Sequence, residues 1–382
     1  MHESLLPLLQ SKRVIVCAGA GGVGKTTVAA ALALSAVREG ARTLCITIDP
    51  AKRLANSLGI GPAAEQQSIG PEWLSKHGVK ARASLDVIML DTKLTFDQLV
   101  SGHASSEAAK QRILNNRIYQ FVSSSLAGTQ SYMAMEKVLQ VKKDDRYDLI
   151  VLDTPPMSHA LDFLAAPERL MDAIDSPAVR ALVQAFELSG RFSFNLLARG
   201  VATVMKGVGR ITGIGFVEEV AEFVTGLNDL FGGFRERAQE VSAAFRGPEF
   251  GYVVVTAPAA TALTEAHYFA WRLKELGIRA DALVVNRVTP ILTETPTLEL
   301  CSATASNLGL PSDASLVRRL QHAATEHVET TDAEQDSLAE IDALFPQAGA
   351  RCQVRIPALA GDVHGVQELW RVAQYLCPGA QD

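Results

Sequence analysis

The sequence is short of the features that mark several protein classes. Its five cysteines are far apart in 382 residues and include no C-x-x-C pair, so neither a disulfide framework nor a cysteine zinc site within one chain is expected. No run of Lys and Arg stands out, and the formal net charge is -6, which gives little support for binding to nucleic acid or anionic lipid. No uncharged apolar run reaches the ~18 residues that span a bilayer.

The first residues, MHESLLPLLQSKRVIVCAGA, lack a basic segment followed by a cleavage site, so no secretory signal is expected. With 48% hydrophobic residues and no internal repeat or low-complexity segment, the chain can bury a large core. These features predict a soluble cytoplasmic protein without stable membrane insertion.

Short apolar runs rich in β-branched residues recur along the chain, with helical stretches between them. Such runs suit strands that are buried on both faces, and their alternation with helices predicts an α/β fold with a doubly wound, mainly parallel sheet. The predicted strands are 13–19, 42–49, 85–91, 147–153, 251–258 and 280–287, followed by a last strand before the C-terminal helix.

Two long helical tracts, roughly 95–141 and 160–245, interrupt this alternation and contain no clear buried strand. We therefore predict a single domain over 1–382 with an α-helical subdomain inserted into it. After Asn286 a polar, Thr-rich stretch reaches about Asp313, and a charged helix then continues to Phe345.

The stretch CAGAGGVGKTT (17–27) contains two glycine motifs. One is the G-x-G-x-x-G of a dinucleotide-binding turn, and the other is the G-x-x-x-x-G-K-[ST] of a phosphate-binding P-loop. Asp49 suits either motif, but the apolar strand YDLIVLD ends in Asp153, which is the Walker B form. A dinucleotide fold needs neither Lys25 nor this second acid, so the sequence favours a P-loop that binds ATP.

Five sequence blocks resemble, in the same order, the ArsA arsenite-pump ATPases and the tail-anchored-protein-targeting ATPases. These belong to the dimerising P-loop ATPases that also include MinD and ParA. The blocks are GAGGVGKTTVAAALAL, TIDPAKRLANSLG (switch I), VLDTPPMSHALDFL (switch II), LVVNR and VRIPALAGDVHGVQEL. GTQSYMAMEKVLQV is similar to the family helix that carries an acidic residue near the dimer interface. The resemblance implies hydrolysis of ATP to ADP and phosphate with Mg²⁺, and a homodimer or a heterodimer with a paralogue. It also implies a protein or hydrophobic client on the helical subdomain.

The resemblance also implies roles for individual residues. Lys25 and Asp49 would be catalytic, with Lys25 on the phosphates and Asp49 orienting the attacking water. Thr26 would ligate Mg²⁺, and Asp153 would support the metal through water. The nucleotide-binding residues would be Gly21, Gly22, Val23, Gly24, Lys25, Thr26, Thr27, Asn286, which would read the adenine edge, and Pro357 of the late loop. Structural alternatives stay open, since Asp49 can cap a helix that starts at Ala51, Asp153 can be an ordinary acid at a strand end, and Asn286 can be a turn residue.

The sequence departs from the resembled families at Ala20, where they carry a second P-loop lysine that reaches across the dimer. Because a neutral methyl group cannot stabilise phosphoryl charge, efficient hydrolysis is in doubt. The chain most resembles bacterial ArsA-related ATPases that lack the signature lysine and have a small residue here, which leaves open that the alanine is normal in this subset. Lys52 or Arg53 could supply the cation instead, or both could be solvated residues of a first helical turn. Cys301 stands alone where targeting ATPases have a C-x-x-C zinc site, so no zinc site is predicted, and no arsenite-binding cysteine triplet is present.

The segment FNLLARGVATVMKGVGRITGIGF has an amphipathic helical pattern. It can pack on its own subdomain, or form a client groove or a membrane-surface contact. The sequence therefore favours an ATP-driven dimeric switch. The alternatives are a catalytically weak regulatory subunit that pairs with a paralogous ATPase, and a MinD-like membrane-surface ATPase.

Overall fold

The computed structural model describes residues 4–48, 53–60, 66–104, 106–117, 119–120, 123, 129–155, 164–174, 177, 236–292, 296–310, 313–348 and 350–378. These residues form a sheet of eight strands in the order β3-β4-β2-β5-β1-β6-β7-β8. The strands are β1 (Val14–Gly19), β2 (Thr43–Thr47), β3 (Gln66–Ile69), β4 (Leu85–Met89), β5 (Leu149–Asp153), β6 (Phe250–Thr256), β7 (Ala282–Val288) and β8 (Cys352–Pro357). Only the pairing of β3 with β4 is antiparallel among the strand pairs of the described residues. The predicted α/β fold with a mainly parallel sheet is confirmed.

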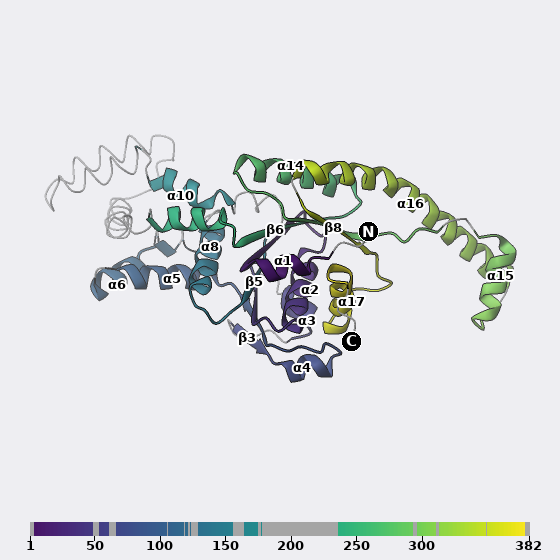
Figure 1. Cartoon of the computed structure of the whole chain (residues 1–382), viewed down its shortest axis with the longest axis horizontal. Coiled ribbons are helices and arrows are strands. Elements are labelled where there is room, and N and C mark those ends of the chain that lie inside the picture. The colour runs from purple at the N-terminus through teal and green to yellow at the C-terminus, as the bar shows by residue number, and fades with distance from the viewer. Residues whose placement is uncertain are drawn as a thin grey trace.

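Helices cover both faces of this sheet (Figure 1). The first face carries α1 (Leu6–Ser11), α2 (Lys25–Arg38), α3 (Arg53–Leu58), α4 (Pro71–Lys76) and α17 (Val366–Leu376). The second face carries α5 (Thr92–His103), α6 (Glu107–Asn115), α8 (Thr129–Lys142), α10 (Ala166–Ile174), helix 236–245, α14 (Ala260–Glu275) and part of α16 (Ala314–Ala348). α15 (Leu298–Asn307) precedes α16.

The continuous apolar run of β1 follows from its central position in the sheet. Val14 and Val16 belong to the core on the second face, whereas Ile15 and Cys17 belong to the core on the first face. Because successive side chains of a strand point to opposite faces, a strand between two helical layers needs apolar residues at every position.

The sequence patterns miss two elements. β3 is a polar edge strand whose Gln66 and Ser68 are exposed, so it lacks the apolar run by which buried strands are recognised. α15 lies inside the stretch expected to be polar loop, and its hydroxyl-bearing N-cap, Thr297, accepts a hydrogen bond from Leu300 N.

The helical tracts 95–141 and 160–245 are described only in part. α5, α6 and α8 lie in the first tract, apart from the start of α5, and α10 and helix 236–245 lie in the second. The amphipathic segment 195–217 lies outside the described residues, and the inserted subdomain stays a prediction.

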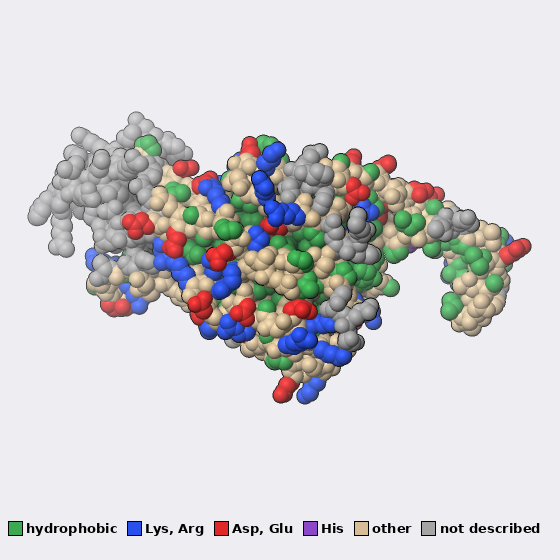
Figure 2. Space-filling view, viewed as in Figure 1, with side chains coloured by type: hydrophobic (Ala, Val, Ile, Leu, Met, Phe, Trp, Pro, Cys, Tyr) green, Lys and Arg blue, Asp and Glu red, His purple; other side chains and the backbone are tan. Residues whose placement is uncertain are grey.

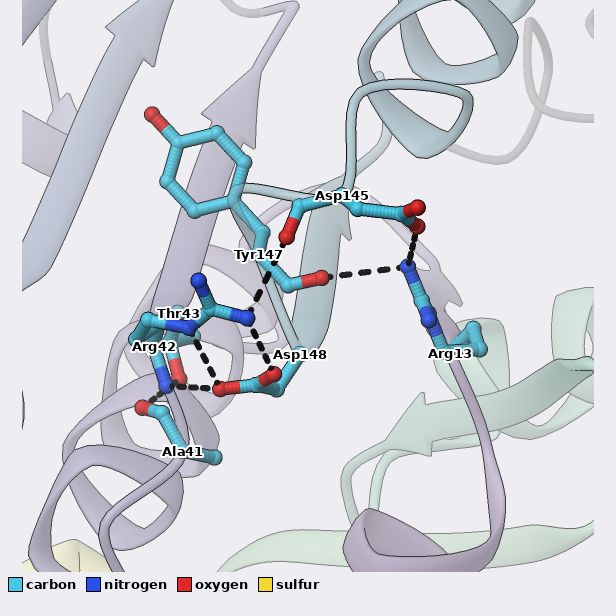
Figure 3. A network of polar contacts seen from close by, with 7 residues as sticks. All are labelled: Arg13, Ala41, Arg42, Thr43, Asp145, Tyr147 and Asp148. Atoms are coloured by element: carbon cyan, nitrogen blue, oxygen red, sulfur yellow. Dashed lines mark hydrogen bonds and ion pairs between the residues drawn. The ribbon is translucent and has the colours of Figure 1, made fainter.

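A polar network lies at the N-terminal ends of β1, β2 and β5, which are opposite to the strand ends that border the P-loop (Figure 3). Arg42, just before β2, donates to both carboxylate oxygens of Asp148, at 2.7 and 3.0 Å. Arg13 donates to the Tyr147 carbonyl at 3.2 Å and forms an ion pair with Asp145 at 3.5 Å. The guanidinium of Arg42 holds the carboxyl pKa of Asp148 at about 2. The network thus ties the starts of β1, β2 and β5 together.

α16 runs away from the sheet and carries α15 at its far end (Figure 1). Four leucines are exposed on or beside α15, namely Leu298, Leu300, Leu308 and Leu310, and apolar surface is visible on this arm in Figure 2. Elsewhere on the face shown, Lys and Arg are interspersed with Asp and Glu. Within the described part of the chain, no helix is both long and apolar enough to cross a membrane.

Candidate functional site

The P-loop lies between the last residue of β1, Gly19, and the first residue of α2, Lys25. Gly24 has φ of +95°, a conformation that L side chains rarely adopt. A Cβ on Gly19 would stand 2.1 Å from the carbonyl oxygen of Val255 on β6. Local packing and backbone conformation therefore require glycine at both fixed glycine positions of the P-loop pattern.

The P-loop leads directly into the N-terminus of α2. The first N–H groups of a helix have no carbonyl oxygen within the helix to which they can donate. Such N–H groups and the helix dipole favour phosphate. Lys25 is only 7% exposed, and its Nζ donates to the carbonyl oxygen of Ala20 at 2.9 Å. The ammonium group is therefore held within the loop that would surround the phosphates.

Asp153 ends β5 beside the P-loop and is 1% exposed. Its Oδ2 accepts hydrogen bonds from Thr26 Oγ1 at 2.7 Å and from Thr47 Oγ1 at 2.9 Å. The predicted metal-site pair, Thr26 and Asp153, is thus in direct contact although 126 positions of sequence lie between them. A hydroxyl and a carboxylate are hard oxygen donors of the kind that Mg²⁺ prefers, so these residues fit a magnesium ion.

Asn286 lies against the P-loop from the other side and is 7% exposed. Its Nδ2 donates to the Val23 carbonyl oxygen at 2.8 Å, and a Cβ on Gly24 would stand 2.2 Å from this nitrogen. The amide therefore supports the loop main chain, a contact that the predicted adenine-reading role does not include. That role itself stays a prediction.

A pocket of about 900 Å³ opens beside Asn286. It is lined by Thr27, Asn286, Arg287, Ile356, Pro357, Ala358, Leu359, Ala360, Gly361, Asp362, Val363, His364 and Val372. Three of the predicted nucleotide-binding residues, Thr27, Asn286 and Pro357, thus share one cavity of a size that suits a nucleotide.

Arg287 stands out in this pocket because its φ is +60°, a value otherwise found only at glycines among the described residues. A register shift in the pairing of β7 with β8 between Val285 and Val288 accompanies this conformation. Beyond the shift, Thr289 donates through its N and Oγ1 to the carboxylate of Glu334 on α16, at 2.9 and 2.6 Å. The irregular segment that contains Arg287 is therefore held from outside the sheet, by a residue of α16.

Several predicted residues lie outside the described part of the chain, among them Asp49 and Lys52. Arg53 begins α3, but its side chain is not described. Gly21 and Gly22 are exposed in the loop, and Val23 is buried. Glu136 on α8, the acidic residue of the predicted interface helix, is 3% exposed and forms an ion pair with Arg237 of helix 236–245.

Two cysteines belong to the strands that carry the site, Cys17 on β1 and Cys45 on β2. Burial raises the pKa of both thiols, with the charge of Asp153 as the next cause. Both thiols therefore stay protonated at neutral pH and pack as small apolar groups.

Comparison with known proteins agrees with this geometry. The model of the anion-transporting ATPase family, ArsA, matches residues 12–308. The protein named ATPase get3 of Aspergillus terreus is 27% identical over 292 residues, which cover 75% of this chain and 77% of that protein. The protein named ATPase GET3 of Phaeosphaeria nodorum is 26% identical over 293 residues, which cover 75% of this chain and 81% of that protein. Since the family match spans the P-loop, Asp153 and Asn286, the chain belongs to the ArsA family and is a nucleotide-binding ATPase.

Proposed function

We propose that the chain is an ATP- and Mg²⁺-dependent dimeric switch that passes its nucleotide state to a helical region holding a protein or hydrophobic client. The observation that carries the proposal is the position of Asp153 in the chain. β5 follows α8 and is succeeded by α10, so the carboxylate expected beside the metal lies between the two predicted helical tracts. A shift of the C-terminal end of β5 would therefore change the positions of both tracts.

Each residue has a distinct task in this proposal. Lys25 would bind the β- and γ-phosphates and Thr26 would ligate Mg²⁺, with Asp153 acting through water. Bound there, Mg²⁺ would neutralise charge on the phosphoryl oxygens. Asn286 and Pro357 would bind the base. Asp49 would orient the attacking water.

A second candidate is a weakly hydrolysing subunit that binds nucleotide and pairs with a paralogous ATPase. The observation that favours it is Ala20, which is only 4% exposed and offers the loop a methyl group and a carbonyl in place of a cation. Removing a cation of this kind can cost about 10³-fold or more in rate.

Turnover and mass, measured together, separate the two candidates. Light scattering gives the mass with ADP, with ATP and with a non-hydrolysable ATP analogue, and phosphate release gives the rate. We expect the switch to turn over ATP and to dimerise only with ATP or the analogue. Tight binding without turnover, and a mass unchanged by any nucleotide, would support the regulatory subunit instead.

Five single variants define the controls. Lys25→Ala should lose nucleotide affinity, whereas Asp49→Asn should keep affinity and lose turnover. Ala20→Lys should raise turnover if the alanine limits the rate. If instead Lys52→Ala and Arg53→Ala each leave the turnover per bound ATP unchanged, neither residue replaces the missing lysine.

A further inference from the structure

The carboxylate of Asp153 has a second hydroxyl partner, Thr47, that the P-loop motif does not include. Thr26 and Thr47 both donate to the same oxygen, Oδ2, from two different elements. Thr47 is the last residue of β2 and is 0% exposed. The acceptor therefore lies where the P-loop, β2 and β5 meet, and solvent does not compete for it.

The main chain fixes the distance between the two strands at this point. Thr47 and Asp153 are directly paired in the parallel ladder, and the amide of Ile48 donates to the Asp153 carbonyl oxygen at 3.3 Å. A threonine in a strand has a restricted χ1 angle, so its hydroxyl is a stiff donor. The hydrogen bond from Thr47 can thus fix the side-chain rotamer of Asp153, in addition to compensating for the cost of burying its carboxylate.

The hydroxyl groups of Thr26 and Thr47 would have different roles when a metal ion binds. Thr26 would have to present its oxygen to Mg²⁺, as the P-loop threonine does in this class of site. Thr47 is on a neighbouring strand and has no such task, so its hydrogen bond can persist while Thr26 adjusts. Thr47 is also the first residue of the switch I block TIDPAKRLANSLG and precedes Asp49 by two residues.

We propose that Thr47 is a positioning residue that holds Asp153 in the orientation required for magnesium, and so couples the end of β2 to the metal site. This inference rests on the proposed ATP- and Mg²⁺-dependent function. It concerns how the carboxylate is held, and no contact of Thr47 with the nucleotide is needed.

Thr43 offers a matched control on the same strand. It is also 0% exposed, and its hydroxyl donates at 2.9 Å to the carbonyl of Ala41, at the opposite end of β2. The variants Thr47→Val and Thr43→Val therefore remove the same atom from the same strand, near the site and far from it. Thr47→Ser keeps the hydroxyl and should behave as the unaltered protein does.

The test is the affinity for ADP, measured by calorimetry with Mg²⁺ and again with EDTA, alongside thermal unfolding of the nucleotide-free protein. In Thr47→Val the ratio of the two affinities should fall about tenfold, the size expected for loss of one hydrogen bond to a charged acceptor. In Thr43→Val and Thr47→Ser the ratio should stay within about twofold of the unaltered protein.

Each outcome decides the proposal. If Thr47→Val loses stability but keeps the ratio, as Thr43→Val should, Thr47 only satisfies a buried carboxylate and the proposal is overturned. If Thr47→Val does not fold, Thr47→Cys replaces it, since a thiol is a weak donor; an unchanged ratio there also overturns the proposal. If the unaltered protein binds ADP equally with Mg²⁺ and EDTA, the proposed magnesium requirement fails first, and this result is recognisable without any variant.

Discussion

Replacing Gly24 by alanine should damage the P-loop while leaving its charge intact. An L residue at the observed φ of +95° is strained, at a cost of about 1–2 kcal/mol. The new Cβ would lie 2.2 Å from Asn286 Nδ2, so Asn286 must move and its hydrogen bond to Val23 breaks, at about 1 kcal/mol. We expect the free energy of unfolding to fall by about 2–3 kcal/mol.

Gly22 and Gly19 separate the two contributions. Gly22 has φ of +78°, but no atom lies within 4 Å of the place that an alanine methyl group would take, so Gly22→Ala should show the backbone strain alone, about 1–2 kcal/mol. Gly19→Ala introduces a contact of 2.1 Å with the Val255 carbonyl without a left-handed backbone, and should disturb the pairing of β1 with β6.

Urea unfolding of the three nucleotide-free variants, followed by circular dichroism, gives the stabilities, and calorimetry gives their affinities for ADP. Gly24→Ala should lose at least tenfold in affinity, because Gly24 is the N-cap residue of α2 and sets the position of its first N–H groups. The reasoning is refuted if Gly24→Ala is no less stable than Gly22→Ala, since contact between Asn286 and the loop would then contribute nothing.

Three further changes probe other parts of the structure. Asp148→Asn should lower the free energy of unfolding at pH 7. The pKa shift of Asp148 from 3.8 to about 2 corresponds to at most about 2.4 kcal/mol. Because the side chain is 45% exposed, solvent screening reduces this to about 1 kcal/mol. Because folding lowers the pKa of Asp148, the stabilisation by its carboxylate is complete above about pH 4 and disappears towards pH 2. The urea midpoints of the variant and the unaltered protein should therefore converge near pH 2. Asp145→Asn, at a side chain that is 93% exposed, is the control. Glu136→Gln should cost about 1.5 kcal/mol, because it removes the charge from the carboxylate that accepts a hydrogen bond from Arg237, and a loss below about 0.5 kcal/mol in urea unfolding would contradict this. Arg287→Gly should relieve a strained backbone and raise the unfolding temperature while weakening ADP binding, whereas Arg287→Ala should weaken binding without the gain in stability.

The parts of the site that the sequence predicts are those defined by chain position alone. A parallel sheet brings the carboxyl ends of its strands to one edge, so the P-loop after one apolar strand and Asp153 at the end of another are expected at the same edge. The contact between Thr26 and Asp153 at 2.7 Å bears this out. The same rule predicts that Asn286 lies at this edge, but it does not reveal that the amide donates to the P-loop.

Other features depend on pairings that no local pattern encodes. Thr47 begins the switch I block, but its contact with Asp153 follows only when β5 is placed beside β2 in the observed register. The backbone of Arg287 depends on a register shift against β8, which lies far along the chain. β3 is an edge strand that needs no apolar face, so its sequence carries no strand signal.

The length of α16 has a mechanical consequence. This helix has 35 residues, and at 1.5 Å per residue the part between Glu334 and Ala314 measures about 30 Å. Glu334 holds the segment after β7 beside the pocket, while α15 lies at the remote end (Figure 1). A tilt of about 5° at Glu334 would displace that end by roughly 2.6 Å over this length. The length of α16 would therefore amplify a small rotation at Glu334 into a larger displacement of α15. The distance between a spin label on α15 and one on the sheet would report rearrangements that are too small to measure at the pocket itself.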